Sequence, residues 1–593
     1  MRAISYACLC LVLALSCATT RQSAPVTEEL GASAVERIEA LIGQGKTAQA
    51  FQSISLYRSD RKGVVPPEKL ASLEQLVVAK TRETFSRNLE AKEYDLALVQ
   101  LHNLNLLGPA EIPAGWNRDR ILSLKLQEYL SGGNPVLALH TFFRIAKKET
   151  LARETLKLLA EQAVRLEHRE AGRALAAAYP DAPEEVKKSL KLVVERQTNP
   201  AELVKSTVTI WVNRGIKIER GIGLPDRVIG SGFFIDPRGY LITNYHVIDS
   251  EVNPKYEGYS RLFIKLSDQA DYKIPAKVIG YDKILDLALL KAETDVKSVV
   301  SIVPSPQLKT GSRVYAVGSP AGLENTVTSG IISATGRRFL QIGEAVQIDV
   351  PVNPGSSGGP LVDEQAGLVG VVFAGIEQFQ GLNFAIPAVW LERFLPRLYR
   401  EGEAGHAWLG LSVAETSGAY EVLYVDPGSP AASAGIQAGD LIDQFQDQRL
   451  ASIPRLQEAI NELENGMLVS LVTRRKQETR RIILALDARP FSPLENRVES
   501  LPRADLFPTL FGFRAESTGA GIFSEDFIIT KVFPGSSADE AGLSENDPFT
   551  LRRWQYDKKN RAIIIQLSIK KRKTGFLEGE IQLGSYIDAN NFI

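Results

Sequence analysis

The stretch NPGSSGGP, from Asn353 to Pro360, decides how the rest of the chain is interpreted. It places Ser357 among glycines in a tight turn, a setting typical of a nucleophilic serine. A hydroxyl becomes a useful nucleophile only beside a base, and the oxygen that gains charge in acyl transfer needs backbone N–H donors. Glycines permit such a turn because they lack a Cβ atom. A plain surface turn between two strands is the alternative interpretation.

A candidate base lies upstream of this turn. The segment SGFFIDPRGYLITNYHVI predicts two strands joined at Asp236–Gly239, with His246 directly after the second strand. Further along, DLALLK places Asp286 at the head of a short apolar strand, where a carboxylate can orient an imidazole. Each of the other four histidines is most simply a surface or helix residue: His102, His140, His168 and His406.

The motifs TNYHVI, DLALLK and NPGSSGGPLVD, followed by GLNFAIP, resemble the HtrA (Do-like) serine proteases, a branch of the chymotrypsin fold. The resemblance covers roughly residues 204–397 and implies an all-β double barrel within a protease domain at 199–400. It implies that Ser357 is the nucleophile and His246 the general base and acid. Asp286 would orient and stabilise the imidazole.

The same resemblance implies an oxyanion hole made by the backbone N–H groups of Gly355 and Ser357, together with Ser356. The family often has Asn where Ser356 stands, but this position would contribute mainly backbone. The substrate pocket would lie beside 371–374, with Pro351 at the position where a Lys- or Arg-specific pocket has an acid. We therefore expect cleavage after small or medium aliphatic residues.

Composition restricts the class of protein. The 593 residues are enough for several domains, and 44% hydrophobic content is ordinary for globular material. The net charge of -1, from 69 basic and 70 acidic residues, gives no reason to expect a nucleic-acid partner. No motif implies a cofactor or a metal.

The first residues predict export. One basic residue followed by a short apolar run at 1–16 is typical of a secretory signal peptide. The run LALSC resembles a bacterial lipobox, in which Cys17 becomes the lipidated first residue of a tether at 17–34. Ala18 next to it favours the outer membrane. A signal peptide cleaved elsewhere is the alternative. Since all three cysteines lie here, the mature chain would have no disulfide or thiolate metal site.

Residues 35–198 have the spacing of amphipathic helices and almost no strand signal. Three turns followed by helices, at about 40-residue intervals, resemble tetratricopeptide-like hairpins, although a plain helical bundle is also consistent with the pattern. This region departs from the HtrA family, and we expect it to dock partners or present substrates.

Two further modules follow the predicted barrel. WLGLSV and VDPGSPAASAGIQAGDLI, within 405–487, resemble a PDZ domain of the HtrA type. The resemblance implies that the N–H groups of Leu409, Gly410 and Leu411 receive a peptide's C-terminal carboxylate. The peptide would add as a strand opposite a helix at 453–463. A β module that only packs on the barrel is the alternative.

The second module is predicted from an internal repeat. VFPGSSADEAGLSEND matches VDPGSPAASAGIQAGD in spacing, which indicates a second PDZ-like domain at 503–593. After Asp547 the next long strand begins near Ala562, whereas after Asp440 it begins near Leu468. About a dozen residues are therefore missing where the groove helix should be, and we expect this degenerate module to serve packing or assembly.

The predicted architecture is therefore a helical domain, an all-β double barrel and two PDZ-like domains. The predicted function is an exported, lipid-anchored serine endopeptidase that cleaves unfolded or mislocalised proteins. The alternative is a catalytically silent chaperone or adaptor that binds exposed protein C-termini. By resemblance the protein would form a homotrimer in the bacterial envelope, on the periplasmic side.

Overall fold

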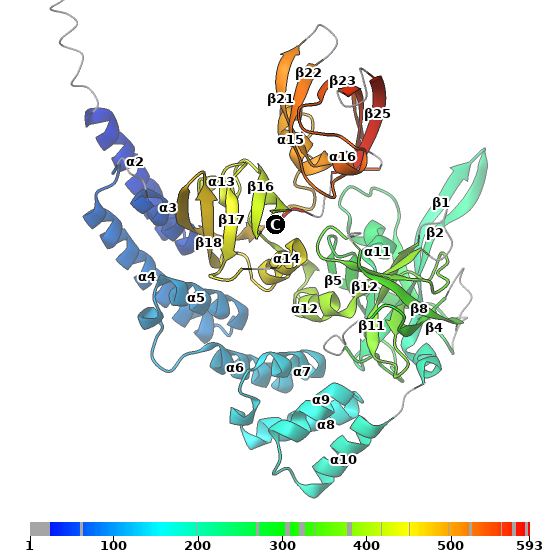
Figure 1. Cartoon of the computed structure of the whole chain (residues 1–593). Coiled ribbons are helices and arrows are strands. Elements are labelled where there is room, and N and C mark those ends of the chain that lie inside the picture. Colours follow the sequence, from blue (N-terminus) through cyan, green and yellow to red (C-terminus); the bar gives the residue numbers. More distant parts are fainter. Residues whose placement is uncertain are drawn as a thin grey trace, which may run out of the picture. The chain divides into compact units, whose positions relative to one another are not determined.

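The computed structural model describes residues 24–59, 63–196, 199–268, 272–302, 309–319, 326–337, 340–375, 382–416, 418–449, 451–495, 497–520, 525–558, 560–571, 577–587 and 591–593. Cys17 and the predicted signal peptide lie outside these residues. The chain forms two compact units, each made of segments distant in sequence (Figure 1). The first comprises Met1–Trp116, Ala407–Ala451 and Leu463–Asp487; the second comprises Asn117–His406, Ser452–Glu462 and Ala488–Ile593.

The first unit begins with helices, as the residue spacing predicts. They are α2 (Ala24–Gly43), α3 (Thr47–Ser59), α4 (Pro67–Glu90), α5 (Tyr94–Leu107) and the 3-10 turn η1 (Pro109–Glu111). Because α2 already begins at Ala24, residues 24–34 are helical rather than a tether. Alanine and glutamate in this stretch have high helix propensity, which the prediction of a tether underestimated.

The PDZ part of the first unit is a five-stranded sheet in the order β15-β16-β17-β18-β19. Its elements are β14 (Ala407–Trp408), β15 (Leu411–Thr416), β16 (Ala419–Val425), α13 (Pro430–Ser433), β17 (Leu441–Phe445), β18 (Leu468–Arg475) and β19 (Glu478–Ala485). The short strand β20 (Asp487–Ala488) follows.

Helices α3 and α5 pack on this sheet through specific polar contacts. Gln52 donates to the carbonyl of Pro430 at 3.0 Å and accepts from the N–H of Ala485 at 2.8 Å. Asn103 donates to Gly466 O at 2.9 Å and accepts from Leu468 N at 2.7 Å. Leu468 and Ala485 also share one apolar core with helical residues, including Ile38, Phe51, Ile54 and Leu73. The N-terminal helices and the PDZ sheet therefore form one folding unit.

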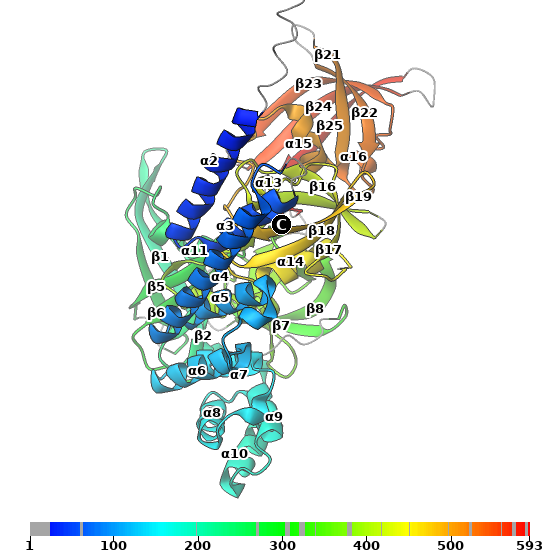
Figure 2. The ribbon, with the colours of Figure 1, turned by 90° about the vertical axis from the view of Figure 1, so that its left-hand side faces the viewer.

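The second unit continues the helical region. Its helices are α6 (Arg118–Ser131), α7 (Pro135–Arg144), η2 (Lys148–Thr150), α8 (Arg153–Arg165), α9 (Arg169–Ala178), α10 (Glu184–Glu195) and η3 (Pro200–Ser206). Figure 2 shows α8, α9 and α10 grouped together, in agreement with their mutual contacts. Within the part of the chain that the structure describes, no helix combines the length and apolar character needed to cross a bilayer.

Two barrels follow, and they confirm the predicted all-β double barrel. The first is a sheet in the order β13-β5-β4-β1-β2-β3-β6 that closes through the pairing of β5 with β6. Its strands are β1 (Thr207–Glu219), β2 (Ile222–Asp236), β3 (Tyr240–Thr243), β4 (Arg261–Leu266), β5 (Ile274–Asp282), β6 (Leu287–Ala292) and β13 (Gly402–Glu403), with α11 (Tyr245–Val252) after β3.

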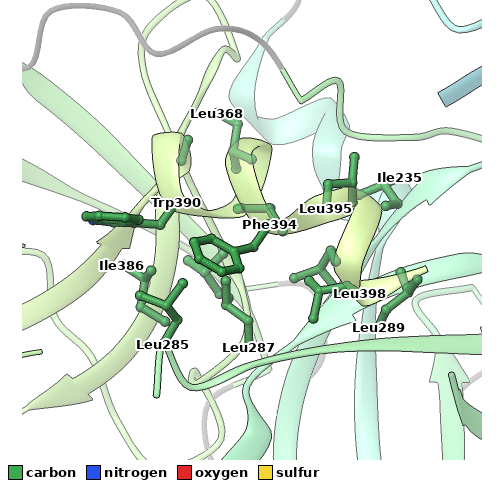
Figure 3. Packing of buried hydrophobic residues seen from close by; sticks show 14 of the residues in the cluster. Ile235, Leu285, Leu287, Leu289, Leu368, Ile386, Trp390, Phe394, Leu395 and Leu398 are labelled. Carbon is green, nitrogen blue, oxygen red and sulfur yellow. The ribbon is translucent and has the colours of Figure 1, made fainter. Parts of the chain in front are cut away.

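The second barrel is closed in the order β10-β11-β12-β9-β8-β7. Its strands are β7 (Arg313–Gly318), β8 (Thr326–Arg337), β9 (Ala345–Ile348), β10 (Pro360–Val362), β11 (Leu368–Gly375) and β12 (Asn383–Pro387). Helix α12 (Ala388–Leu398) follows and contributes Trp390, Phe394 and Leu398 to a core that also contains Leu285 and Leu287 of the first barrel (Figure 3). This core fixes the segment that leads into Asp286.

The C-terminal module is a second five-stranded sheet in the order β21-β22-β23-β24-β25. Its elements are α15 (Arg503–Phe511), β21 (Phe513–Ala520), β22 (Glu525–Val532), α16 (Ser537–Glu540), β23 (Pro548–Asp557), β24 (Ala562–Lys571) and β25 (Leu577–Tyr586). The described residues between β23 and β24 form a turn, whereas β17 and β18 are separated by α14 (Ile453–Asn461). The predicted loss of the groove helix is thus what the structure has.

The histidines other than His246 are not surface residues. His102 and His140 lie in helices as expected, and His168 is the N-cap of α9, where its ring accepts a hydrogen bond from Ala171 N. His406 lies outside the helices and is only 1% exposed, so its expected surface or helix position is wrong. Its two ring nitrogens have hydrogen-bond partners, which makes burial of a polar ring tolerable.

Candidate active site

The end of β3 places His246 against the turn that contains Asp286. Asn244 follows β3 and donates through Nδ2 to the carbonyl of Asp286 at 2.8 Å. The N–H of Tyr245 donates to the same carbonyl at 3.2 Å. Helix α11 begins at this point, so His246 stands in its first turn. Contacts to the backbone of Asp286 therefore hold the two predicted residues next to each other, in addition to the contact between their side chains.

The Asp286 carboxylate holds His246 at two points. Its Oδ1 accepts from the backbone N–H of His246 at 2.8 Å, and its Oδ2 lies 2.7 Å from the ring Nδ1. Asp286 itself has a φ of +57°, in the left-handed region that non-glycine residues seldom adopt. Such a conformation is kept only where the surrounding structure determines it.

Electrostatics favour the protonated ring of His246. Burial by itself lowers the pKa of His246, but the charge of Asp286 and its hydrogen bond outweigh burial, and the pKa is raised above 6.5. The His246 side chain is nonetheless 46% exposed, so its outer face is open to a substrate or to solvent. A base with a moderately raised pKa is suited to accept a proton from a hydroxyl.

Ser357 lies in a glycine turn that contacts the first barrel directly. Gly358 has a φ of +88°, and a Cβ atom there would come within 2.2 Å of Ser231 O and 2.4 Å of Thr243 Oγ1. The Ser357 carbonyl accepts from Ser231 N at 2.7 Å. Since Thr243 is the last residue of β3, the serine turn and the segment leading to His246 are held together.

The Ser357 hydroxyl contacts the second barrel. Its Oγ donates to the carbonyl of Phe373 at 3.4 Å, and the contacts of the described residues include no hydrogen bond between Ser357 and His246. Catalytic hydrogen bonds are often long or misaligned in the absence of substrate. Rotation of the Ser357 side chain would be needed to direct its Oγ to the imidazole.

The turn also bears on which backbone donors could serve an oxyanion. Gly355 has a φ of +101°, in the left-handed region that favours glycine. The N–H of Ser356, however, donates to the carbonyl of Asn353 at 2.9 Å. In this conformation the N–H of Ser356 is used inside the turn, which favours the other two predicted donors over Ser356. Gly355 and Ser357 remain as candidates.

Ser231 is a site residue that the sequence interpretation missed. It is fully buried, and its Oγ donates to the carbonyl of Gly355 at 2.6 Å and accepts from the N–H of Ser319 at 2.9 Å. It therefore fixes the orientation of the peptide plane next to the serine turn. The only available signal was its place in the run GSGF, between two glycines at the start of a buried strand.

Comparison with known families agrees with this geometry. Residues 230–371 match the trypsin-like peptidase domain, residues 407–486 match the PDZ domain, and residues 495–587 match the TP0546 family PDZ domain. The double barrel with its serine turn thus defines a trypsin-like peptidase followed by two PDZ domains.

Similarity to individual proteins indicates the family more specifically than the domain matches do. A probable periplasmic serine endoprotease DegP-like of Marinomonas sp. (strain MWYL1) is 35% identical over 340 residues, 54% of this chain and 70% of that protein. A protein of the same name from Chlamydia pneumoniae is 30% identical over 338 residues, 54% of this chain and 67% of that protein. The solved HtrA-type protease AlgW with decapeptide aligns at 26% identity and a TM-score of 0.42, over 49% of this chain and 98% of that one.

By its similarity to these curated relatives, the chain belongs to the DegP-like serine endoproteases, and it is a serine endopeptidase.

Proposed function

We propose that His246, Asp286 and Ser357 form the catalytic triad of this endopeptidase. His246 takes the proton of Ser357 as the hydroxyl attacks the scissile carbonyl, and the tetrahedral oxyanion is bound by the N–H groups of Gly355 and Ser357. His246 then protonates the leaving amine. Water then attacks the acyl-enzyme while His246 takes its proton, and His246 returns that proton to Ser357 Oγ as the carboxylic acid product leaves.

The observation that supports this proposal most strongly is that the Asp286 carboxylate contacts both the backbone N–H and the ring Nδ1 of His246. A carboxylate on Nδ1 leaves Nε2 of the neutral ring free of a proton, which is the form that a general base requires. The raised pKa of His246 is consistent with this role.

Labelling with a fluorophosphonate tests the assignment against the alternative of a silent chaperone or adaptor. Full-length protein should form one adduct, and peptide mapping should place it on Ser357. Absence of any adduct, with and without added C-terminal peptide, would leave the binding function as the better interpretation. Adduct at Ser356 instead would show that the nucleophile is wrongly assigned.

We further propose that the first PDZ module binds peptide C-termini through Leu409, Gly410 and Leu411. Gly410 has a φ of +89°, and its carbonyl accepts from Asp426 N at 2.8 Å, while Leu409 O accepts from Ala431 N at 2.9 Å. These two hydrogen bonds hold the loop at 409–411 through the carbonyl groups of Leu409 and Gly410. Unfolded or mislocalised proteins with exposed hydrophobic C-termini are the proposed substrates.

The second module is proposed to have no comparable peptide site. Its Gly512 matches Gly410 in having a positive φ, but the Gly512 N–H caps α15 by donating to the carbonyls of Phe507 and Pro508. A donor that is already bonded within a helix cannot receive a carboxylate. Packing or assembly is the proposed role of the second module. The helical region, with its tetratricopeptide-like repeat, is proposed to dock partners or present substrates. Homotrimer formation is also part of the proposal, on the family resemblance alone.

For location we propose the periplasm, with a lipid anchor at Cys17 in the outer membrane; the names of the relatives support the periplasmic part. Cys17→Ser should convert a membrane-bound protein into a soluble exported one, because the thiol that carries the lipid is lost. Membrane fractionation measures the change. Cys10→Ser, inside the predicted signal peptide, is the matched control and should remain membrane-bound. Tight membrane association of Cys17→Ser would point to a different anchor.

A further inference from the structure

The turn that presents Asp286 depends on a second, buried aspartate. Asp282 ends β5 and is fully buried. Its Oδ1 accepts from the N–H groups of Ile284 and Leu285, both at 2.9 Å. These two bonds shape the three residues between Asp282 and Asp286. Because Asp286 has a left-handed backbone, the turn needs such external support to keep its conformation.

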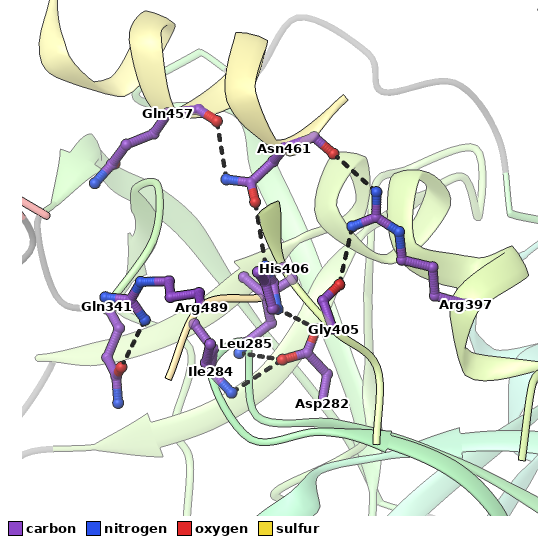
Figure 4. A network of polar contacts seen from close by, with 10 residues as sticks. All are labelled: Asp282, Ile284, Leu285, Gln341, Arg397, Gly405, His406, Gln457, Asn461 and Arg489. Carbon is purple, nitrogen blue, oxygen red and sulfur yellow. Dashed lines mark hydrogen bonds and ion pairs between the residues drawn. The ribbon is translucent and has the colours of Figure 1, made fainter. Parts of the chain in front are cut away.

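The other oxygen of this carboxylate meets a buried histidine. Asp282 Oδ2 lies 2.8 Å from Nε2 of His406, and both side chains are fully buried (Figure 4). His406 follows β13, which pairs in parallel with β5, so the segment after the protease barrels runs along the strand that ends at Asp282. The His406 ring also packs on Phe394, with ring centroids 4.4 Å apart.

His406 is connected in turn to α14. Its Nδ1 lies 3.2 Å from Oδ1 of Asn461, and Asn461 Nδ2 donates to the carbonyl of Gln457 at 2.8 Å. Since the amide nitrogen of Asn461 is bonded on the helix, its Oδ1 is the atom that faces the His406 ring. Figure 4 shows the resulting line of contacts from α14 through His406 to Asp282.

A buried arginine fixes the same junction. Arg397, only 8% exposed, donates to Gly405 O at 3.2 Å and to Asn461 O at 3.4 Å. The backbone next to His406 and the last turn of α14 are therefore held by one side chain. This leaves His406 little freedom to move away from Asp282.

We propose that Asp282 and His406 are positioning residues for catalysis: they hold the 283–286 turn so that Asp286 engages His246, and they link that turn to Asn461 of α14. The inference rests on the proposed triad. If His406 is lost, a buried carboxylate keeps two backbone donors but loses its third partner, and the turn relaxes toward other conformations. Helix α14, predicted to face a bound peptide, thereby becomes part of the support of Asp286.

The test compares His406→Phe with His406→Gln in the full-length protein. His406→Phe fills the same space without a donor and should lower kcat for a fluorogenic peptide by roughly 10-fold to 100-fold, the size expected for a misplaced catalytic group. KM should change little, because His406 is buried and does not contact the substrate. His406→Gln keeps an N–H donor for Asp282 and should recover most of kcat.

His168→Phe is the matched control. His168 is also a buried histidine of the second unit, with its Nε2 2.9 Å from the carbonyl of Ile302. It should lower the melting temperature without changing kcat of the folded protein. If His406→Phe behaves in the same way, with kcat unchanged, the positioning role is refuted.

Two further measurements separate positioning from general destabilisation. The acid limb of kcat/KM against pH should shift to lower pH in His406→Phe, because a displaced Asp286 no longer raises the pKa of His246. Asn461→Leu should reduce kcat less, and combining it with His406→Phe should add nothing further. An unshifted acid limb or full additivity would contradict the proposed link.

The proposed triad is checked in the same experiment by Ser357→Ala. If that variant keeps its activity, the triad is wrong. If it is inactive while His406→Phe has the kcat of the unchanged protein, only the positioning role fails.

Discussion

Ser357→Ala should abolish proteolysis of casein, with kcat reduced by roughly 10⁴-fold to 10⁶-fold. The hydroxyl is the proposed nucleophile, and an alanine has no group that could replace it. Folding should be intact because the substitution removes one oxygen whose single described hydrogen bond is a 3.4 Å contact with Phe373. Far-UV circular dichroism and a thermal melt establish that the variant is folded.

Ser356→Ala is the matched control for this experiment. Its hydroxyl is only a distant acceptor, 3.4 Å from Asn353 N, and its backbone bond to Asn353 survives the substitution. Most of the activity should remain. If Ser356→Ala is inactive and Ser357→Ala is active, the two serines have been assigned in the wrong order.

Asp286→Asn should reduce kcat by about 10⁴-fold, the size of effect expected when the histidine adopts the wrong tautomer. The backbone N–H of His246 donates to Oδ1, so the amide oxygen of the asparagine will stay at that position. Its NH₂ group then faces Nδ1 of His246 and forces the ring proton onto Nε2. A histidine protonated on Nε2 cannot accept the proton of Ser357.

The pH dependence gives an independent measure of the same pair. His246 must be neutral to act as a base, and its pKa is raised, so the acid limb of kcat/KM should lie above pH 6.5 in the unchanged protein. The residual activity of Asp286→Asn should have its acid limb at lower pH. Asp249→Asn, on the same helix and in contact with Tyr245, is the control and should alter neither kcat nor the pH profile.

The residues of the proposed triad could be selected from the sequence because each lies in a short motif with local causes, and the structure places two of them, His246 and Asp286, in contact. His246 follows a hairpin, Asp286 precedes a strand, and Ser357 lies in a glycine turn. The missing helix of the C-terminal module could also be predicted, since a repeat with Ala562 too close to Asp547 leaves no residues for it. In each of these cases the prediction needed only the spacing of residues within a short stretch of the sequence.

The residues whose role could not be predicted from the sequence make their contacts with residues that are distant in the chain. Ser231 matters because Gly355 and Ser319 come to it in the fold, and His406 because it meets Asp282. No local pattern distinguishes such a serine or histidine from a surface residue. The bond from Ser356 N to Asn353 O could not be predicted for a related reason, since the direction of one N–H depends on how the whole turn closes.

The contact between Gln52 and Ala485 has a consequence for biogenesis. These residues are 433 positions apart, so helix α3, which contains Gln52 and Phe51, leaves the ribosome long before the strand that completes its packing exists. At about 5 to 20 residues per second, the delay is roughly 20 to 90 seconds. During that time the part of α3 that packs on the PDZ sheet is uncovered, and we expect the nascent chain to need a holding factor or an export route that keeps it unfolded.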